Sequence, residues 1–226
     1  MHRLLPLLAL LAAPLPAQLV TYTFGSAASP TTAPASVAAH LTAGAFSAAA
    51  GSPGTASGSP VHSAGSGGSF FTASAWTGAA PGANRFEFTV TPAAGFALAA
   101  TSLSFAYRAT ASGPVSFALR TSADAFASDL LAGTLTNDST WRSSGTLSLA
   151  LPATEDPLVL RLHASGASSA LGTLRIDDLA LGGTVSAVPE PATAAVGLGG
   201  VALLLAAAAR RRPGARKWQG AARGRP

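Results

Sequence analysis

Two adjacent carboxylates, Asp177 and Asp178, interrupt a run of apolar residues towards the end of the long central region. Carboxylate oxygens suit Ca²⁺, so the pair could form a structural calcium site completed by backbone carbonyls. The D-x-D-x-D-G loop of a dedicated calcium site does not accompany them. The favoured interpretation is that Asp177 pairs with a neighbouring arginine while Asp178 caps a turn, and the calcium site is the alternative. No cofactor is expected apart from this alternative.

Two tryptophans, Trp76 and Trp141, are the candidates for contacting a sugar. An exposed aromatic ring offers an apolar face against which a sugar ring can stack. The same residues also suit the core or the rim of a sheet, where the large ring is buried. Glycan stacking and core packing are therefore alternative roles for both residues.

The sequence patterns of hydrolytic enzymes are absent from the chain. Neither a G-x-S-x-G nucleophile motif nor an H-E-x-x-H metal motif occurs. A glycosidase needs two facing carboxyl groups, but Glu87 falls on the outward phase of a predicted strand and Glu155 in a predicted turn. His163 falls on the polar phase of another predicted strand, which indicates a solvent-exposed side chain. We therefore predict a protein that is not an enzyme.

The elements that position these residues are predicted to be short strands. From Asn84 onward, apolar and polar residues alternate in runs that are separated by Gly, Pro, Asn, Asp or Ser. Such alternation indicates antiparallel strands buried on one face. The runs at 19–24, 86–90, 103–107, 115–119, 147–151, 158–162 and 174–181 suggest about eight strands in two sheets. We predict an all-β, jelly-roll-like antiparallel β-sandwich over residues 18–187.

The last strand is expected to be irregular. Leu174 and Ile176 share one of its faces, whereas Leu179 and Leu181 fall on the opposite face. A regular strand cannot bury both pairs on one side, so a β-bulge is predicted at the two aspartates between them.

The first third of the sandwich has a sparse composition. Residues 25–69 are mostly Ala, Ser, Gly, Thr and Pro, with little large apolar surface apart from Leu41 and Phe46. We expect this segment to be rich in loops, and residues 51–68 to be loop or disordered.

The charge distribution excludes a nucleic acid as partner. The 226 residues carry a net charge of +5 and contain no cysteine, which also excludes disulfides and thiolate metal sites. Seven of the 14 basic residues lie in the last 17 positions, whereas residues 18–187 hold six arginines and eight acidic residues. This central region is therefore net −2 and has no basic face for a phosphate backbone.

The N-terminus has the layout of a secretory signal peptide. A short basic stretch that ends at Arg3 precedes an apolar run over residues 4–15, and Ala17 is a small residue before the expected cleavage point. We predict that residues 1–17 are the signal peptide and that the rest of the chain is exported.

Three features follow one another near the C-terminus: Pro189-Glu190-Pro191, the uncharged residues 192–209, and Arg210-Arg211-Arg212. The prolines keep the first segment extended. A helix of residues 192–209 would be about 27 Å long, which nearly matches the hydrocarbon core of a bilayer. Arginines directly after a span favour its cytoplasmic end. We predict a single transmembrane helix over 192–209 and a basic cytoplasmic tail over 213–226.

This ordered set over residues 188–212 resembles the PEP-CTERM protein-sorting signal, a segment also known as an ice-binding protein C-terminal domain. The resemblance implies a bacterial envelope or exopolysaccharide setting. It also implies that an exosortase, a membrane-embedded cysteine transpeptidase, recognises and cleaves the Pro-Glu-Pro motif. The exosortase and the membrane would then be partners of the chain. Residues 213–226 extend beyond the point at which members of this family generally end.

These features predict an exported structural or adhesive protein of the cell envelope or extracellular matrix. It is expected to be anchored in the membrane with the sandwich outside, or to be released to the matrix after cleavage. The alternative is a carbohydrate-binding module that binds extracellular polysaccharide, with Trp76 or Trp141 in contact with the sugar. A third alternative, a hydrolase, would require a cleft with two convergent carboxylates.

Overall fold

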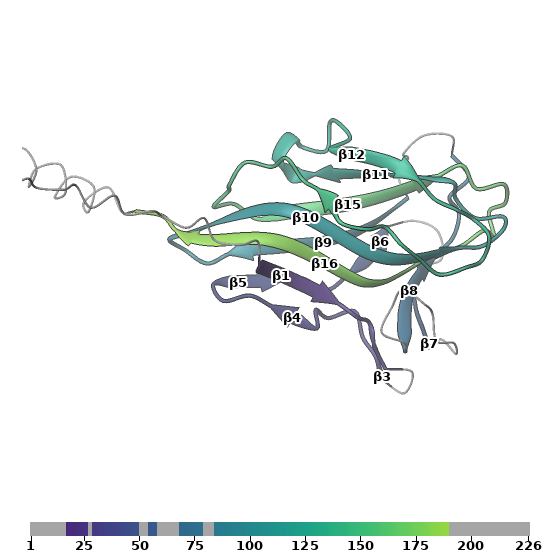
Figure 1. Ribbon diagram of the computed structural model, residues 1–226, viewed down its shortest axis with the longest axis horizontal. Helices are drawn as coiled ribbons and strands as arrows, with labels where there is room; N and C mark the ends of the chain where they lie inside the picture. Colours follow the sequence, from purple (N-terminus) through teal and green to yellow (C-terminus); the bar gives the residue numbers. More distant parts are fainter. Residues whose placement is uncertain (1–16, 27–28, 50–53, 58–67, 79–83, 190–226) are drawn as a thin grey trace, which may run out of the picture. The chain divides into compact units, whose positions relative to one another are not determined.

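The structure is a computed structural model that describes residues 17–26, 29–49, 54–57, 68–78 and 84–189 (Figure 1). Glu190, Pro191, the predicted span over 192–209, Arg210 to Arg212 and the tail over 213–226 lie outside these residues, as do residues 1–16 of the predicted signal peptide. None of the helices within the described residues combines the length and the apolar character needed to cross a membrane.

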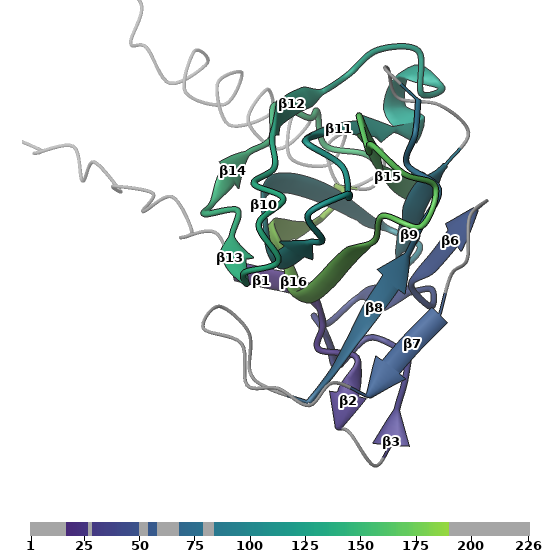
Figure 2. The ribbon, with the colours of Figure 1, turned by 90° about the vertical axis from the view of Figure 1, so that its right-hand side faces the viewer.

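The described residues form two antiparallel sheets and one small two-stranded sheet of β2 (Gly25–Ser26) and β3 (Ser29–Pro30). The eight-stranded sheet has the order β13 (Arg142–Ser143), β10 (Phe96–Ala109), β16 (Leu174–Ala187), β1 (Ala17–Tyr22) and β4 (Ser36–Val37), with β14 (Leu147–Ser148) beside β10, β8 (Ser69–Ala73) beside β16, and β7 (Gly54–Ser57) beside β8. The six-stranded sheet has the order β12 (Leu131–Thr134), β11 (Ser116–Thr121), β15 (Leu158–Ser165), β9 (Arg85–Pro92) and β5 (Leu41–Ala43), with β6 (Ser47–Ala49) beside β9. Figure 2 shows the two sheets as separate layers. The predicted antiparallel β-sandwich is confirmed.

Side-chain alternation places the core between the two sheets. In β9 every second residue is buried, as predicted from the run at 86–90, and the buried residues include Phe86, Phe88 and Val90. Phe46 is 2% exposed, and its ring lies between 5.1 and 6.0 Å, centroid to centroid, from five other aromatic rings. These rings belong to Tyr22, Phe24, Phe71, Phe86 and Phe88. Phe46 is therefore the centre of an aromatic cluster between the layers.

The predicted bulge in the last strand is confirmed. Ser104 pairs with Ala180 and Ala106 pairs with Asp177, so Asp178 and Leu179 together lie opposite the single residue between. Asp178 adopts a φ of 45°, a left-handed conformation that Asp tolerates better than most residues. The extra residue restores the inward phase, and the four aliphatic residues at 174, 176, 179 and 181 are at most 1% exposed.

Three local predictions are wrong or incomplete. The segment expected to be loop-rich contains the strands β5, β6 and β7. Strands β5 and β6 pair with β9, and β7 pairs with β8. Small side chains allow these backbone hydrogen bonds, so the composition alone does not exclude strands. The predicted strand at 147–151 shrinks to Leu147–Ser148. Val115, expected to face the core, is 42% exposed because it precedes β11.

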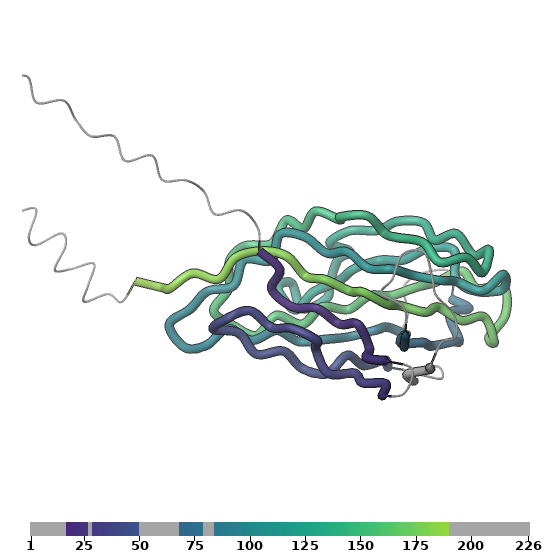
Figure 3. Tube along the Cα trace, turned by 60° about the horizontal axis from the view of Figure 1, so that its bottom comes forward, coloured from purple at the N-terminus to yellow at the C-terminus, as the bar shows by residue number. Residues whose placement is uncertain are grey.

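The two ends of the sandwich lie on adjacent strands. Ala17 at the start of β1 pairs with Gly183 of β16, and β16 continues to Ala187 (Figure 3). The chain divides into two compact units, of which the first ends at Ala187 and the second begins at Val188. The first unit thus contains every strand of the two sheets.

Candidate functional site

The two tryptophans do not form a sugar-stacking platform. Trp76 is 1% exposed; its Nε1 donates a hydrogen bond to the carbonyl of Ala73 at 2.9 Å and its ring lies against Phe86. Trp141 is 6% exposed and packs edge to face on Phe70, with a centroid distance of 5.7 Å. Trp76 therefore belongs to the main core, whereas Trp141 belongs to a separate small cluster with Phe70 and Ala106. Neighbouring side chains cover both rings.

The two aspartates do not present a joint set of oxygens to a cation. Asp177 is fully buried, and its Oδ1 accepts a hydrogen bond from the amide of Asp178 at 2.8 Å. Asp178 instead lines an open hollow of about 340 Å³ beside β1. No group of three or more His, Asp or Glu residues that could hold a metal ion occurs among the described residues. The described residues thus lend no support to the calcium alternative.

His163 also differs from its prediction. Its side chain falls on the outward phase of β15, yet it is only 5% exposed. The reason is its position on a central strand, where it pairs with Ala118 of β11 on one side and Arg85 of β9 on the other. Alternation in the sequence shows that a side chain points away from the core, but it does not show whether neighbouring strands cover that side chain.

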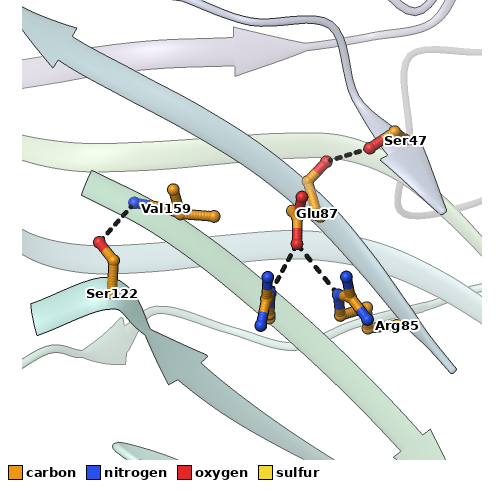
Figure 4. A network of polar contacts seen from close by, with 6 residues as sticks. Ser47, Arg85, Glu87, Ser122 and Val159 are labelled. Atoms are coloured by element: carbon orange, nitrogen blue, oxygen red, sulfur yellow. Dashed lines mark hydrogen bonds and ion pairs between the residues drawn. The ribbon is translucent and has the colours of Figure 1, made fainter. Parts of the chain in front are cut away.

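A network of charged side chains lies on the outer face of the six-stranded sheet. Arg85 and Arg161 each donate from Nε to Oε2 of Glu87, at 3.0 and 2.6 Å. Figure 4 shows the Glu87 carboxylate with contacts to both guanidinium groups, while the Glu87 carbonyl accepts a hydrogen bond from Ser47 of β6. The three ion-paired side chains are 24–28% exposed. Their polar groups are thus held in place and remain open to solvent.

The network continues across the sheet in one row of cross-strand neighbours. Arg120 of β11 pairs with Arg161 of β15, which pairs with Glu87 of β9. The guanidinium carbon of Arg161 lies 3.5 Å from the ring centroid of Phe126, and Arg120 donates to Asp129 at 2.6 Å. We call the six residues that form this network the charged face: Arg85, Glu87, Arg120, Phe126, Asp129 and Arg161. Alternation predicts that Arg85 and Glu87 point outward, but only the register brings them beside Arg161 and Arg120.

A hollow of about 250 Å³ occurs where β15 begins. It is lined by Ser122 and Ala123 of the 3₁₀ turn η1 (Ser122–Asp124) and by residues 151–158, except Glu155. Ser122 Oγ accepts a hydrogen bond from the amide of Val159 at 2.9 Å (Figure 4). The same hydroxyl donates a hydrogen bond to the carbonyl of Pro157 at 3.3 Å. These bonds hold η1 against the start of β15.

The electrostatics of Glu87 give a testable pH dependence. Partial burial raises the pKa of Glu87, but hydrogen bonds and charges from Arg161 and Arg85 outweigh it, and the pKa lies below its usual value. A carboxyl whose pKa is lower in the folded state stabilises the protein above its unfolded pKa, which is about 4.3, and loses this effect as pH falls through the folded pKa. We expect Glu87→Gln to be less stable than wild type at neutral pH and to match it in strong acid.

The measurement is urea unfolding of both proteins across this pH range. Glu155→Gln, which changes an exposed residue in a turn, is the control for a general loss of negative charge. A constant stability difference between wild type and Glu87→Gln down to strong acid would contradict the role of ionised Glu87.

The fold and the site together define a class of protein: an antiparallel β-sandwich with a solvent-accessible charged face whose arginines and carboxylates form ion pairs with each other. No family model matches the chain, and no curated protein matches it. Similar folds occur among solved structures. The K1 cleaved adhesin domain of the Lys-gingipain of Porphyromonas gingivalis W83 has a TM-score of 0.43 and 14% identity, over 74% of this chain and 99% of that one.

Two further similar structures are complexes with oligosaccharides. TmCBM61 in complex with β-1,4-galactotriose has a TM-score of 0.37 and 13% identity, over 63% of this chain and 88% of that one. The CBM22-1–GH10 modules of the Clostridium thermocellum xylanase 10B, complexed with xylohexaose, have a TM-score of 0.41 and 9% identity, over 76% of this chain and 30% of that one. At these TM-scores the likeness is one of general architecture and carries no assignment of ligand.

Proposed function

We propose that the sandwich binds polysaccharide through the charged face, and that the chain is exported and held at the cell envelope by its C-terminal segment. The observation that carries the binding proposal is the row of Arg120, Arg161 and Glu87 across three adjacent strands. The ion pairs and the Phe126 ring hold these planar groups in place before any ligand arrives.

The chemistry of this row suits a sugar chain. A guanidinium presents several N–H donors in one plane and a carboxylate presents acceptors, so together they match the paired hydroxyl groups of a sugar. Side chains that are already fixed lose little conformational entropy on binding. Three arginines against two carboxylates leave the charged face nearly neutral, which does not favour a polyphosphate.

The same network supports a binding role rather than a hydrolytic one. A glycosidase needs one carboxyl group that stays protonated at working pH and donates its proton to the leaving group. Glu87 has the opposite environment, because two guanidinium groups lower its pKa. The other carboxylate of the charged face, Asp129, is bound to Arg120. We therefore propose a non-catalytic protein.

The proposal for the C-terminal segment rests on the sequence and on one feature of the fold. The PEP-CTERM-like motif begins at Pro189, two residues after β16 ends at Ala187. A processing enzyme could therefore act on the motif without taking a residue from either sheet. We propose that the membrane and an exosortase are the partners of this segment and that polysaccharide is the partner of the sandwich.

The binding proposal predicts that the purified full chain is retained by polysaccharide and that Arg161→Ala weakens binding about tenfold, the equivalent of about 1.4 kcal/mol. Xylohexaose, β-1,4-galactotriose and bacterial exopolysaccharide are suitable probes, measured by affinity electrophoresis and calorimetry. Arg161→Ala is expected to act because it removes the guanidinium at the centre of the row.

The matched control is Arg142→Ala. Arg142 also pairs with an aspartate, Asp138, but belongs to the eight-stranded sheet, so its loss should leave retention unchanged. Thermal unfolding of each variant shows whether the sandwich is intact. Absence of retention on every polysaccharide by folded wild-type protein would refute the binding proposal.

A further inference from the structure

Two arginines lie directly opposite each other on the outer face of the eight-stranded sheet. Arg108 of β10 pairs with Arg175 of β16 in the strand register. Their neighbours along both strands are buried, so alternation directs both guanidinium groups away from the core. We call these two residues the arginine pair.

This arrangement is unfavourable without a compensating anion. Like charges directly opposite on adjacent strands repel each other. Burial, together with the charge of Arg108, lowers the pKa of Arg175. Within the described residues, Arg85, Arg120, Arg142 and Arg161 each form an ion pair with a carboxylate, whereas Arg108 and Arg175 form none.

Three hydrogen-bonding atoms of the arginine pair and of Thr173 lack a partner within the described part of the chain. The Nε atoms of Arg108 and Arg175 are buried, and neither has a hydrogen-bond partner among the described residues. The same holds for Oγ1 of Thr173, which precedes Arg175 by two residues and therefore lies on the same face of the sheet. No acceptor among the described residues therefore satisfies these three donors.

The guanidinium group of Arg175 lies over an aromatic ring. Its guanidinium carbon lies 4.7 Å from the ring centroid of Phe70, and Trp141 packs edge to face on that ring. Asp177 belongs to the same face, but its side chain is fully buried and accepts the amide hydrogen of Asp178.

We infer that the arginine pair binds the acidic group of a glycan, either a carboxylate or a sulfate, on the face of the sandwich opposite the charged face. The inference rests on the proposed function in that the ligand is a glycan. Guanidinium forks bind planar or tetrahedral oxyanions through two parallel hydrogen bonds, and two forks side by side match one such group. The anion relieves the repulsion between the arginines, so binding and stabilisation occur together.

The test compares the full-length wild type with Arg108→Gln and with the Arg108→Gln/Arg175→Gln double variant. The probes are inorganic sulfate, glucuronate, an oligogalacturonate and the neutral xylohexaose. We expect oligogalacturonate to bind wild type and to lose about tenfold or more in affinity in either variant, because bidentate charge-assisted bonds are lost. Xylohexaose binding should not change, because its proposed contacts are on the charged face.

Thermal unfolding supplies a second readout that separates binding from a packing role. Without anion, Arg108→Gln should melt at a higher temperature than wild type, since it removes the repulsion. Sulfate or glucuronate should raise the melting temperature of wild type in a saturable way, since they bind the native state, and should raise that of the variants less. Arg142→Gln, the same charge change at a residue already neutralised by Asp138, should respond like wild type.

The outcomes distinguish the two proposals. If the small anions stabilise only wild type and Arg142→Gln while no polysaccharide binds, the anion site stands and the glycan as ligand is refuted. If xylohexaose binds but wild type and the double variant respond equally to sulfate, glucuronate and oligogalacturonate, the polysaccharide proposal stands and the anion site is refuted. A lower melting temperature of Arg108→Gln without anion would also count against the arginine pair as a repulsive, ligand-requiring site.

Discussion

Replacing Phe46 by alanine is expected to lower the free energy of unfolding by about 3–5 kcal/mol, which is a large part of the stability of a domain of this size. The ring is 2% exposed and contacts five other aromatic rings from both sheets. Its removal leaves a cavity that rigid neighbours cannot close, and it deletes the edge-to-face contacts with Phe24 and Phe71. Urea unfolding followed by tryptophan fluorescence measures the loss.

Phe96→Ala is the matched control for this prediction. Phe96 is half-buried at the start of β10, where its ring stacks on His40 with a centroid distance of 3.8 Å. Loss of this surface contact should cost roughly 1 kcal/mol. Similar losses for the two variants would show that Phe46 is not the centre of the core.

Deleting residues 192–212 is expected to change where the protein resides without changing its fold. The proposed span is barely long enough to anchor the chain, and the arginines after it are costly to translocate, so their removal should yield a freely secreted form. The thermal unfolding of the sandwich should not change, because the strands of both sheets end by Ala187. Cell fractionation and calorimetry test the two parts. Retention of the deleted form in the membrane fraction would contradict the anchor.

Replacing Pro189, Glu190 and Pro191 by alanines addresses processing separately from anchoring. In a host with an exosortase, the variant should stay anchored and uncleaved, whereas the wild type should lose its C-terminal segment. Intact mass spectrometry of mature protein from hosts with and without the enzyme measures the difference. A wild-type C-terminus at Pro226 in both hosts would contradict cleavage and leave a membrane anchor alone.

The strands with clear alternation could be predicted from the sequence, and so could the bulge. The phases of β9, β15 and β16 are set by large apolar side chains at every second position, and the change of phase between Ile176 and Leu179 requires one extra residue. Strands β5, β6 and β7 could not be predicted in this way. They are short and poor in large side chains, and backbone pairing with β9 and β8 defines them.

The candidate sites depend on register, which a single sequence does not reveal. Outward phases could be assigned to Arg85 and Glu87, but their meeting with Arg161 requires the pairing of β9 with β15, whose ranges lie about 70 residues apart in the chain. The same applies to Arg108 and Arg175. The sequence instead pointed to Trp76 and Trp141 as sugar-binding candidates. Both are buried, because large rings gain more free energy from packing than from exposure.

The course of β16 has a mechanical consequence. This strand pairs with β10 along its whole length, from Leu174 to Ala187, and with β1 on its other side. A pull transmitted through the residues after Ala187 acts along the strand, whereas its hydrogen bonds to both neighbours run across it. If a ligand bound to a face of the sandwich pulls in the opposite direction, the hydrogen bonds of β16 are loaded in shear. They then share the force and do not break one after another. A domain anchored through β16 would therefore resist unfolding under force while it is bound to a polymer that moves relative to the anchor.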